Sequence, residues 1–324
     1  MSQKLMVVIP CYNEEEVLPE TSRRLTLKMK ALIEKGACDE TSRVLFVDDG
    51  SKDKTWELIR ALHQENPLFE GLKLSRNRGH QNALLAGLMT ARKHCDFCIS
   101  MDADLQDDMD AMDRFINEYR DGCDIVYGVR NKRDTDTFFK RQTALAFYRM
   151  MKSLGVDITY NHADYRLMSR RALDALAGFR EVNLFLRGLA PLVGFQSGYV
   201  YYDRNERFAG KSKYPFKKML AFAIDGITSF SVKPLRLITT LGLVVFVISL
   251  LMLIYTLISF IVGHTVTGWT STIASIWLIG GIQLLSLGVI GEYIGKIYNE
   301  SKHRPRFIID RYLNGEGFDP EKDE

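Results

Sequence analysis

The chain has 324 residues, of which 26% are charged, and its formal net charge is only +3. This length accommodates one sizeable soluble domain and a smaller second part, and we expect no nucleic-acid partner. The charges are unevenly distributed, because no Asp, Glu, Lys or Arg lies between Leu237 and Gly291. The composition therefore predicts two parts, one with charged residues throughout and one without charged residues that lies in apolar surroundings.

The first two hundred residues alternate short apolar runs with amphipathic stretches. The pattern predicts strands at 5–10, 43–48, 71–75, 97–101 and 124–128, and helices at 14–34, 53–65, 79–91 and 109–119. Such alternation implies right-handed crossovers and a mainly parallel sheet that is covered on both faces. We therefore expect an α/β fold whose ligands bind beyond the carboxyl ends of the strands.

Polar segments follow the first three predicted strands. They are Pro10-Cys-Tyr-Asn-Glu14, Asp48-Asp-Gly-Ser-Lys-Asp53 and Arg76-Asn-Arg-Gly-His80. Each segment alone is explained by a turn or a helix cap, but together at one sheet edge they suggest a cradle for a nucleoside diphosphate. The chain contains no Gly-x-x-x-x-Gly-Lys-Ser/Thr and no strand-linked Gly-x-Gly-x-x-Gly, which argues against a P-loop or a dinucleotide site.

Two acidic residues follow the fourth predicted strand. At strand spacing Asp102 and Asp104 point the same way, and Gln106 continues the alternation. Oxygen donors on one side suit Mg²⁺ or Mn²⁺, with positions left for the phosphates of a substrate. An Asp-x-Asp triplet is a weak signal, so a solvated acidic turn that caps the next helix is the alternative.

Two uncharged segments, 237–262 and 272–291, are each long enough to cross a bilayer, because about 20 apolar residues span a ~30 Å hydrocarbon core. Lys and Arg flank this pair on both sides and are absent from the loop 263–271, so the positive-inside rule predicts that both termini are cytoplasmic. No secretory signal is predicted. Two helices buried in a soluble core are the alternative.

These motifs together resemble the family 2 glycosyltransferases with a GT-A fold. The resemblance is carried by Val7-Val-Ile-Pro-Cys-Tyr-Asn-Glu14, Val47-Asp-Asp-Gly-Ser51, Arg76-Asn-Arg-Gly79 and Asp102-Ala-Asp-Leu-Gln106. Within that family, the chain is similar over nearly its whole length to polyprenyl-phosphate glycosyltransferases of the bactoprenol glucosyltransferase and dolichyl-phosphate mannose synthase type. The resemblance implies metal-dependent, inverting transfer of one hexose, glucose or N-acetylglucosamine, from a UDP-sugar to undecaprenyl phosphate.

The resemblance also assigns roles to individual residues. It predicts that the nucleotide is bound by Pro10, Tyr12, Glu14, Asp48, Asp49 and Arg76. It predicts that Mg²⁺ or Mn²⁺ is held by Asp102, Asp104 and Gln106. The predicted catalytic residues are Asp104, Asp164, Arg130, Arg207 and Lys211, and the predicted acceptor-binding residues are Arg207, Lys211, Ser212 and Tyr214. Asp164 would face the reacting centre, stabilise an oxocarbenium-like sugar or orient an arginine. Arg207 and Lys211 have an alternative role as a juxtamembrane cluster attracted to anionic lipid.

The predicted organisation has four parts. They are a cytoplasmic GT-A domain at 1–212, an amphipathic interfacial helix at 213–232, two transmembrane helices at 233–296 with an external loop at 263–271, and a cytoplasmic tail at 297–324. We expect a multi-pass protein of the cell membrane. Glycines in the second span allow a homo-oligomer or only packing within one chain. Further predicted partners are a flippase and a downstream transferase that uses the lipid-linked sugar. Cys95 and Cys98 have Cys-x-x-Cys spacing, and we expect them to be plain reduced residues.

Two other functions compete with this one. Processive polysaccharide synthases carry a Gln-x-x-Arg-Trp motif, which is absent because no Trp of this chain follows an Arg. A non-catalytic membrane scaffold with a degenerate nucleotide fold would bind UDP without turnover. A channel is disfavoured because the predicted spans hold no ionisable residue apart from His264 at the loop edge. The identity of the sugar does not follow from the sequence.

Overall fold

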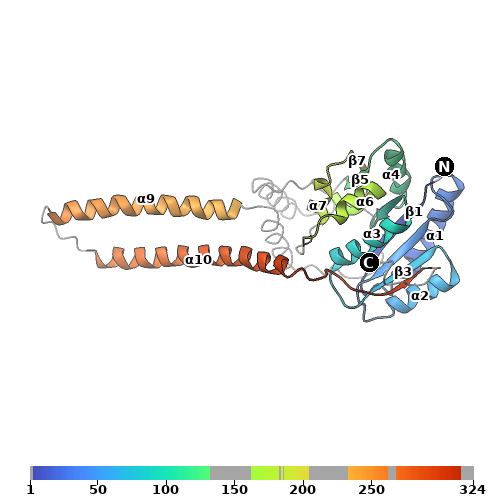
Figure 1. The fold of residues 1–324 in the computed structure, drawn as a ribbon, viewed down its shortest axis with the longest axis horizontal. Coiled ribbons are helices and arrows are strands. Elements are labelled where there is room, and N and C mark those ends of the chain that lie inside the picture. Colours follow the sequence, from blue (N-terminus) through green and yellow to red (C-terminus); the bar gives the residue numbers. More distant parts are fainter. Residues whose placement is uncertain are drawn as a thin grey trace. The chain divides into compact units, whose positions relative to one another are not determined.

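The computed structural model describes residues 3–131, 162–181, 184, 186–203, 233–261 and 268–314. An eight-stranded sheet with its helices forms one compact unit, and two long helices form a second (Figure 1). The acceptor residues Arg207, Lys211, Ser212 and Tyr214 and the interfacial segment 213–232 lie outside the described residues.

The first unit alternates strands and helices as predicted, with boundaries that shift by a few residues. Its strands are β1 Leu5–Cys11, β2 Arg43–Asp48, β3 Phe69–Leu74, β4 Phe97–Ser100, β5 Ile125–Arg130, β6 His162–Ser169, β7 Ser197–Tyr202 and β8 Ile309–Leu313. Its helices are α1 Leu18–Glu34, α2 Thr55–Glu65, α3 His80–His94, α4 Ala111–Arg120, α6 Arg170–Ala177 and α7 Leu186–Leu192. The second unit contains α9 Lys233–Ile261 and α10 Trp269–Ser301.

The sheet has the strand order β7-β5-β6-β4-β1-β2-β3-β8 and is mainly parallel, which confirms the predicted α/β class. β1 pairs in parallel with β2 and β4, β2 with β3, and β5 with β7. β6 runs antiparallel to both β4 and β5. The amino end of β6 therefore lies at the same edge as the carboxyl ends of β1 to β5 and β7, which is the edge where ligands bind in such sheets.

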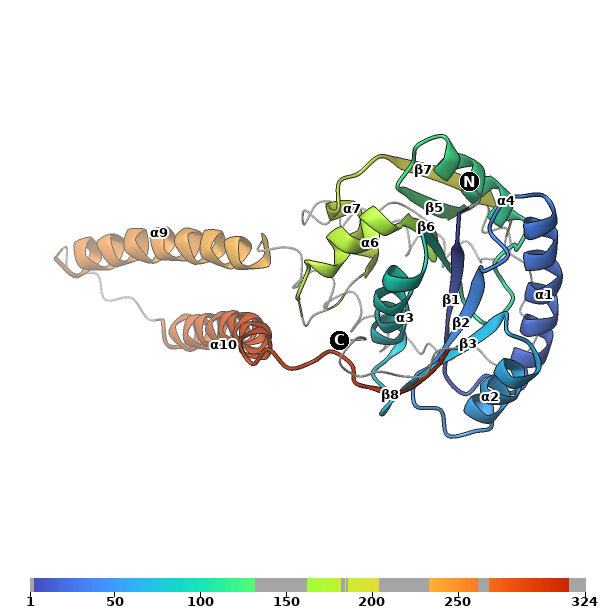
Figure 2. The same ribbon diagram turned by 45° about the vertical axis from the view of Figure 1, so that its right-hand side comes forward.

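Helices cover both faces of the sheet (Figure 2). β1 is buried along its whole length, as a central strand covered on both sides must be. Its residues Leu5, Val7 and Ile9 share a core cluster with apolar residues of α1, α2 and α4. On the other face α3 packs so closely that a Cβ added at Gly87 would lie 2.4 Å from Cγ1 of Val8. This double cover holds the strand ends rigidly and so positions the loops that follow them.

The strand β8 lies in the segment predicted to be a tail, and it pairs antiparallel with β3 at the sheet edge. The hydroxyl of Tyr312 donates a 2.7 Å hydrogen bond to Oε2 of Glu70, and both side chains are buried. Sequence periodicity did not predict this strand, because five residues with mixed polarity carry little pattern. The rest of the predicted tail, beyond residue 314, lies outside the described part of the chain.

Replacing Tyr312 by Phe is expected to loosen β8 from the sheet. The change leaves the buried Glu70 carboxylate without its hydroxyl donor, which costs about 1–3 kcal/mol. Amide hydrogen exchange in β3 and β8 should therefore accelerate by about tenfold or more. Tyr201→Phe is the matched control, because that side chain is 54% exposed. Unchanged exchange in Tyr312→Phe would show that the hydroxyl does not hold the strand.

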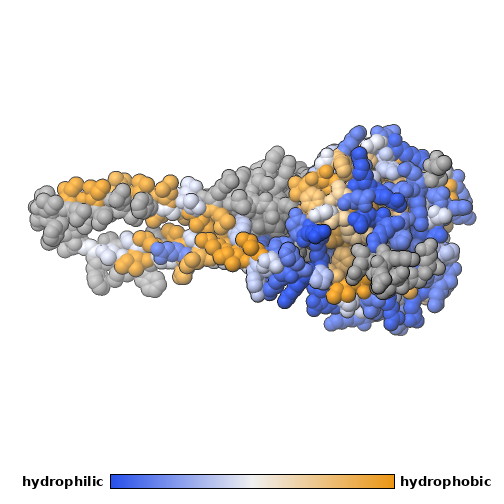
Figure 3. Space-filling model, in the orientation of Figure 1, coloured by the Kyte–Doolittle hydropathy of each residue, from blue (hydrophilic) through white to orange (hydrophobic). Residues whose placement is uncertain are grey.

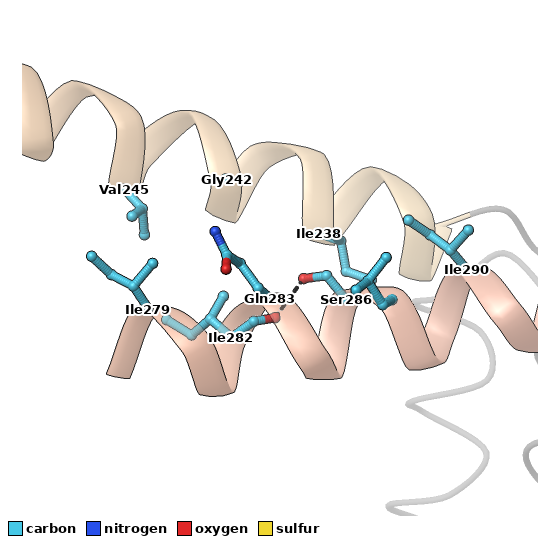
Figure 4. Close-up of a pocket in the computed structure, with 9 residues that line it drawn as sticks. Ile238, Gly242, Val245, Ile279, Ile282, Gln283, Ser286 and Ile290 are labelled. Atoms are coloured by element: carbon cyan, nitrogen blue, oxygen red, sulfur yellow. Dashed lines mark hydrogen bonds between the residues drawn. The ribbon is translucent and has the colours of Figure 1, made fainter. Parts of the chain in front are cut away.

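The second unit is a hairpin of two apolar helices, with 29 residues in α9 and 33 in α10. Apolar side chains dominate its visible surface, whereas the first unit is mostly hydrophilic (Figure 3). A groove between the helices is lined by apolar side chains together with Gly242, Gln283 and Ser286 (Figure 4). Among the residues that the structure describes, no helix combines the length and the apolar character that a membrane crossing requires, and the two predicted spans are not confirmed.

Candidate active site

The loops after β1 and β2 are tied together by hydrogen bonds at the carboxyl edge of the sheet. The backbone N–H of Asn13 donates to Oγ of Ser51 at 3.0 Å, and Oδ1 of Asn13 accepts from the N–H of Lys52 at 2.9 Å. Asn13 has φ 55°, a left-handed conformation that Asn tolerates better than most residues. The N–H of Glu14 donates to Oγ1 of Thr55 at 2.9 Å. The Tyr-Asn-Glu motif thus organises both loops.

The two aspartates after β2 have different partners. Asp49 accepts the backbone N–H groups of Arg78 and Gly79 at 2.7 and 2.9 Å, which anchors the β3–α3 loop. Asp48 accepts the N–H of Ser51 through Oδ1, whereas its buried Oδ2 has no hydrogen-bond partner among the described residues. Burial raises the pKa of the Asp48 carboxyl. An unsatisfied buried acceptor can take a hydroxyl or N–H donor from a ligand, which fits the nucleoside role predicted for Asp48.

Gly50 occupies a position that no other residue fits. Its φ is 66°, and a Cβ there would lie 2.6 Å from the backbone N of Asn77 and 2.7 Å from the carbonyl carbon of Arg76. Any side chain would therefore push the β2–α2 and β3–α3 loops apart. The glycine allows the two polar segments to come together.

Gly50→Ala is expected to destabilise the fold by about 3 kcal/mol and to weaken UDP binding, because it combines backbone strain with a steric clash. Gly36→Ala is the matched control. Gly36 has a similar φ of 64° but no atom within 4 Å of the added Cβ, so that change should cost only about 1–2 kcal/mol. Unfolding midpoints and UDP titration measure both effects. Equal losses in the two variants would show that the loop contact is unimportant.

The acidic loop after β4 shows the alternation that its spacing predicts. Asp102, Asp104 and Gln106 are partly exposed, while the intervening Ala103 and Leu105 are buried. Leu105 has φ 59°, a costly conformation for a branched side chain and one that functional loops often retain. Thr21 of α1 donates through Oγ1 to the carbonyl of Ala103 at 3.0 Å and holds the loop in place.

The donors of this loop suit a hard cation. Burial raises the pKa of Asp102 to about 6; His80 opposes the shift, and the nearby carboxylates, among them Asp104, add to it. Crowded oxygen ligands of this kind are what Mg²⁺ or Mn²⁺ would neutralise. Among the described residues, no three His, Cys, Asp or Glu side chains are grouped so that they could hold a metal ion. The metal roles of Asp102, Asp104 and Gln106 therefore stay predictions.

The register between β4 and β6 brings Asp164 to the acidic loop. Ser100 pairs with Arg166, so continuing the antiparallel register by two residues places Asp102 opposite Asp164. His80, the first residue of α3, lies between them, with Nε2 3.5 Å from Oδ1 of Asp102 and 3.5 Å from Oδ2 of Asp164. Desolvation lowers the pKa of His80, but the two carboxylates outweigh it and raise the pKa to about 9.

Asp164 is enclosed by cationic side chains. Its Oδ1 accepts from Nη2 of Arg166 at 2.8 Å and from Nε of Arg187 at 3.2 Å, and its Oδ2 accepts from Nη2 of Arg187 at 3.0 Å. Burial alone would raise the pKa of Asp164, but Arg187, His80 and Arg166 hold it well below its usual range. Asp164 is therefore a carboxylate.

Arg130 forms a second polar group at the end of β5. Its Nη2 lies 3.3 Å from Oδ1 of Asp107, and its Nε lies 3.3 Å from the Tyr202 hydroxyl. That hydroxyl donates to the same Asp107 oxygen at 2.6 Å, while Oδ2 of Asp107 is buried and has no hydrogen-bond partner in the part of the chain that the structure describes. Desolvation opposes the charge of Arg130, but Asp107 and Tyr202 outweigh it and raise its pKa. The group holds a partly exposed guanidinium at the sheet edge.

The predicted residues are thus distributed unevenly. The edge brings together Asp48, Asp49, Asp102, Asp104 and Asp164, with Arg130 at the end of β5. Pro10 is buried in β1, Tyr12 and Glu14 are partly buried, and Arg76 is exposed. Sequence reasoning missed five side chains that complete the edge: His80, Asp107, Arg166, Arg187 and Tyr202. His80 stands inside a motif already singled out and Arg166 is two residues after Asp164, whereas Arg187 and Tyr202 lie on elements that periodicity did not predict. The five cysteines are free and buried, as expected for reduced residues.

This is an α/β fold with a mainly parallel sheet, and its polar motifs gather at the carboxyl ends of the strands. Residues 6–177 match the family model described as glycosyl transferase family 2, and residues 233–297 match the GtrB C-terminal hairpin. The chain belongs to glycosyl transferase family 2, and it is a glycosyltransferase. The predicted resemblance to its polyprenyl-phosphate branch is confirmed.

Similar proteins cover nearly the whole chain. The uncharacterised glycosyltransferase YkoT of Bacillus subtilis is 55% identical over 98% of this chain and 94% of its own length. The bactoprenol glucosyl transferase of Shigella phage SfV is 40% identical over 94% of this chain and 98% of its own. The prophage-derived bactoprenol glucosyl transferase of Shigella flexneri is 39% identical over 96% and 99%.

Proposed function

We propose that this glycosyltransferase moves one hexose from a UDP-sugar to a polyprenyl phosphate, with inversion at the anomeric carbon. The observation that carries the proposal is the convergence of the acidic loop with His80 and the Asp164 cluster at the edge where the nucleotide-binding motifs meet. Relatives named bactoprenol glucosyl transferases match nearly the full length, which supports glucose as the first sugar to test. N-acetylglucosamine is the other candidate.

Asp102, Asp104 and Gln106 are the residues that would hold Mg²⁺ or Mn²⁺. A divalent cation there would neutralise the diphosphate that leaves with the nucleoside. The unsatisfied Oδ2 of Asp48 would accept a hydrogen bond from the nucleoside, and Asp49 would act by holding the neighbouring loop. Asp107 and Tyr202 fix the guanidinium of Arg130, which would then bind an anionic oxygen of the substrate.

The acceptor requires no strong base. A phosphate monoester carries about −1.5 to −2 charge near neutral pH, so its oxygen is already a nucleophile. The harder task is to bring this anion next to the donor diphosphate, which calls for fixed positive charge. The predicted acceptor residues Arg207, Lys211, Ser212 and Tyr214 would supply part of that charge and of the remaining contacts.

We also propose that the hairpin of α9 and α10 anchors the enzyme in the cell membrane with both termini cytoplasmic. Support comes from the match to the GtrB C-terminal hairpin and from the absence of Asp, Glu, Lys and Arg between 237 and 291. A polyprenyl acceptor is available only at a membrane. A homo-oligomer, a flippase and a downstream transferase stay predictions.

The test is transfer from a panel of radiolabelled UDP-sugars to undecaprenyl phosphate by the purified full chain with Mg²⁺ or Mn²⁺. One labelled lipid product would establish the reaction and identify the sugar. UDP binding without product from any donor would instead favour the non-catalytic scaffold. Polymeric product would favour a processive synthase.

A further inference from the structure

We propose that Arg187 is a phosphate-binding residue of this site and that Asp164 is the residue that positions it. The inference rests on the proposed function, because that reaction brings two phosphate-bearing ligands to the edge, the nucleotide donor and the lipid acceptor. In both ligands the group that would contact Arg187 is a phosphate oxygen, which would accept hydrogen bonds from its guanidinium. The experiment below distinguishes the phosphate of the donor from that of the acceptor.

Arg187 and Asp164 form a bidentate pair, which is called the fork below. Nε and Nη2 of Arg187 lie 3.2 and 3.0 Å from the two oxygens of Asp164, so both atoms on one side of the guanidinium are engaged. Such bidentate pairing fixes the plane of the guanidinium as well as its position. The Asp164 side chain is 7% exposed, whereas Arg187 is 32% exposed. The carboxylate is thus the buried anchor, and the arginine is the member of the pair that reaches solvent.

The backbone next to Arg187 is also held. The N–H of Leu186 donates to Oε1 of Gln81 on α3 at 2.8 Å, and the Leu186 carbonyl accepts from Nη1 of Arg166 at 3.1 Å. Arg187 is therefore fixed from both its main chain and its side chain. A group held in this way loses little conformational entropy when it binds an anion.

The two cations that contact Asp164 differ in exposure. Arg166 and Arg187 both contact the Asp164 carboxylate directly. Arg166 is buried, whereas the Arg187 side chain is partly exposed and is the one that a phosphate oxygen can reach. His80 lies 3.5 Å from Asp164 on the side of Asp102, which places the fork next to the acidic loop. A phosphate at the edge would meet the Arg187 guanidinium.

The same contacts make Asp164 unsuited to the role of a general base. Both of its oxygens face arginine or His80, and proton uptake would break contacts with at least one cation. A phosphate acceptor needs no base of this kind. Among the roles considered for Asp164, the geometry supports the one in which it orients an arginine.

The experiment compares Arg187→Gln and Arg187→Lys with Arg92→Gln in the purified full chain. Arg92 is a matched control, because it is 29% exposed and pairs with Asp174 at 3.6 Å, at the opposite end of α3 from His80. We measure UDP binding at equilibrium with Mg²⁺, and kcat and KM for undecaprenyl phosphate. Arg187→Gln should lower kcat/KM about tenfold to a hundredfold, which is the contribution of a hydrogen bond to a charged group. Arg187→Lys should recover part of that loss, and Arg92→Gln should stay within about twofold.

Whichever of the two constants changes, the KM for undecaprenyl phosphate or the UDP affinity, identifies the ligand whose phosphate Arg187 binds. A raised KM for undecaprenyl phosphate with unchanged UDP affinity assigns Arg187 to the acceptor, and weaker UDP binding assigns it to the donor. Adding Asp164→Asn to Arg187→Gln should cost little further activity, because a positioning residue acts through the group it holds. A full additional loss from Asp164→Asn would overturn the positioning role.

Unchanged kcat/KM and unchanged UDP affinity in Arg187→Gln would overturn the phosphate-binding role, and so would a lowered melting temperature without a change in either constant. Failure of the proposed function is recognised separately, because wild type would then bind UDP without forming lipid product. In that case the role of Arg187 is judged from UDP affinity alone. Weaker UDP binding by Arg187→Gln supports the phosphate-binding role, and unchanged UDP binding overturns it.

Discussion

Asp104→Asn is expected to abolish sugar transfer while the fold stays intact. The side chain is partly exposed at the sheet edge, and one of its oxygens accepts the N–H of Gln106 at 3.2 Å, a bond that the amide oxygen of Asn can also accept. If Asp104 holds Mg²⁺ or Mn²⁺, the amide removes half of the paired negative charge. We expect kcat to fall by about a hundredfold or more.

The measurements are transfer rates over a range of Mg²⁺ and Mn²⁺ concentrations, metal-dependent UDP binding, and the melting temperature. Asp110→Asn is the control from the same acidic segment, because Asp110 is 89% exposed and contacts Lys28 of α1. It should leave transfer nearly unchanged. An Asp104→Asn enzyme with wild-type rates and wild-type metal dependence would remove the metal assignment.

Arg166→Met is expected to cost about 3 kcal/mol or more in free energy of unfolding. Arg166 is 2% exposed, and its guanidinium bonds both Asp164 and the carbonyl of Leu186. Methionine fills similar space, but it removes one of the cations that pair with the buried Asp164 carboxylate. It also leaves the Leu186 carbonyl without the Arg166 donor. Removing one partner of a buried ion pair typically costs this much.

Urea unfolding of the detergent-solubilised chain measures the loss as a lower midpoint at unchanged slope. Arg170→Met is the matched control on the neighbouring helix, because the Arg170 side chain is 49% exposed and lies 3.9 Å from Asp96. That change should cost less than about 1 kcal/mol. Equal midpoints for the two variants would show that the Asp164 cluster contributes no special stability.

Much of the candidate site could be predicted because strand periodicity and motif position carry directional information. In a parallel sheet, every residue just after a strand lies at one edge, so Asp48, Asp49, Asp102 and Asp104 could be grouped from the sequence alone. The alternating exposure from Asp102 to Gln106 matches the prediction, although these residues lie in a turn after β4 and not on the strand itself.

The partners of Asp164 could not be predicted by that logic. Asp164 stands near the start of β6, and it reaches the edge only because β6 runs antiparallel to β4 and β5. Strand direction depends on pairing between distant segments, which local periodicity does not encode. Arg187 and Tyr202 come from further elements that meet the edge only after the chain has folded.

The amino-acid sequence by itself determined the α/β class, the edge that holds the acidic loop, the family and the uncharged hairpin segment, because each depends on local spacing or composition. Only the tertiary structure decided that Asp164 is a clamped carboxylate, that His80 bridges it to Asp102, and that β8 completes the sheet. These features arise from the register and direction of strands that lie far apart along the chain, and their energies come from burying charges that meet only in the folded protein.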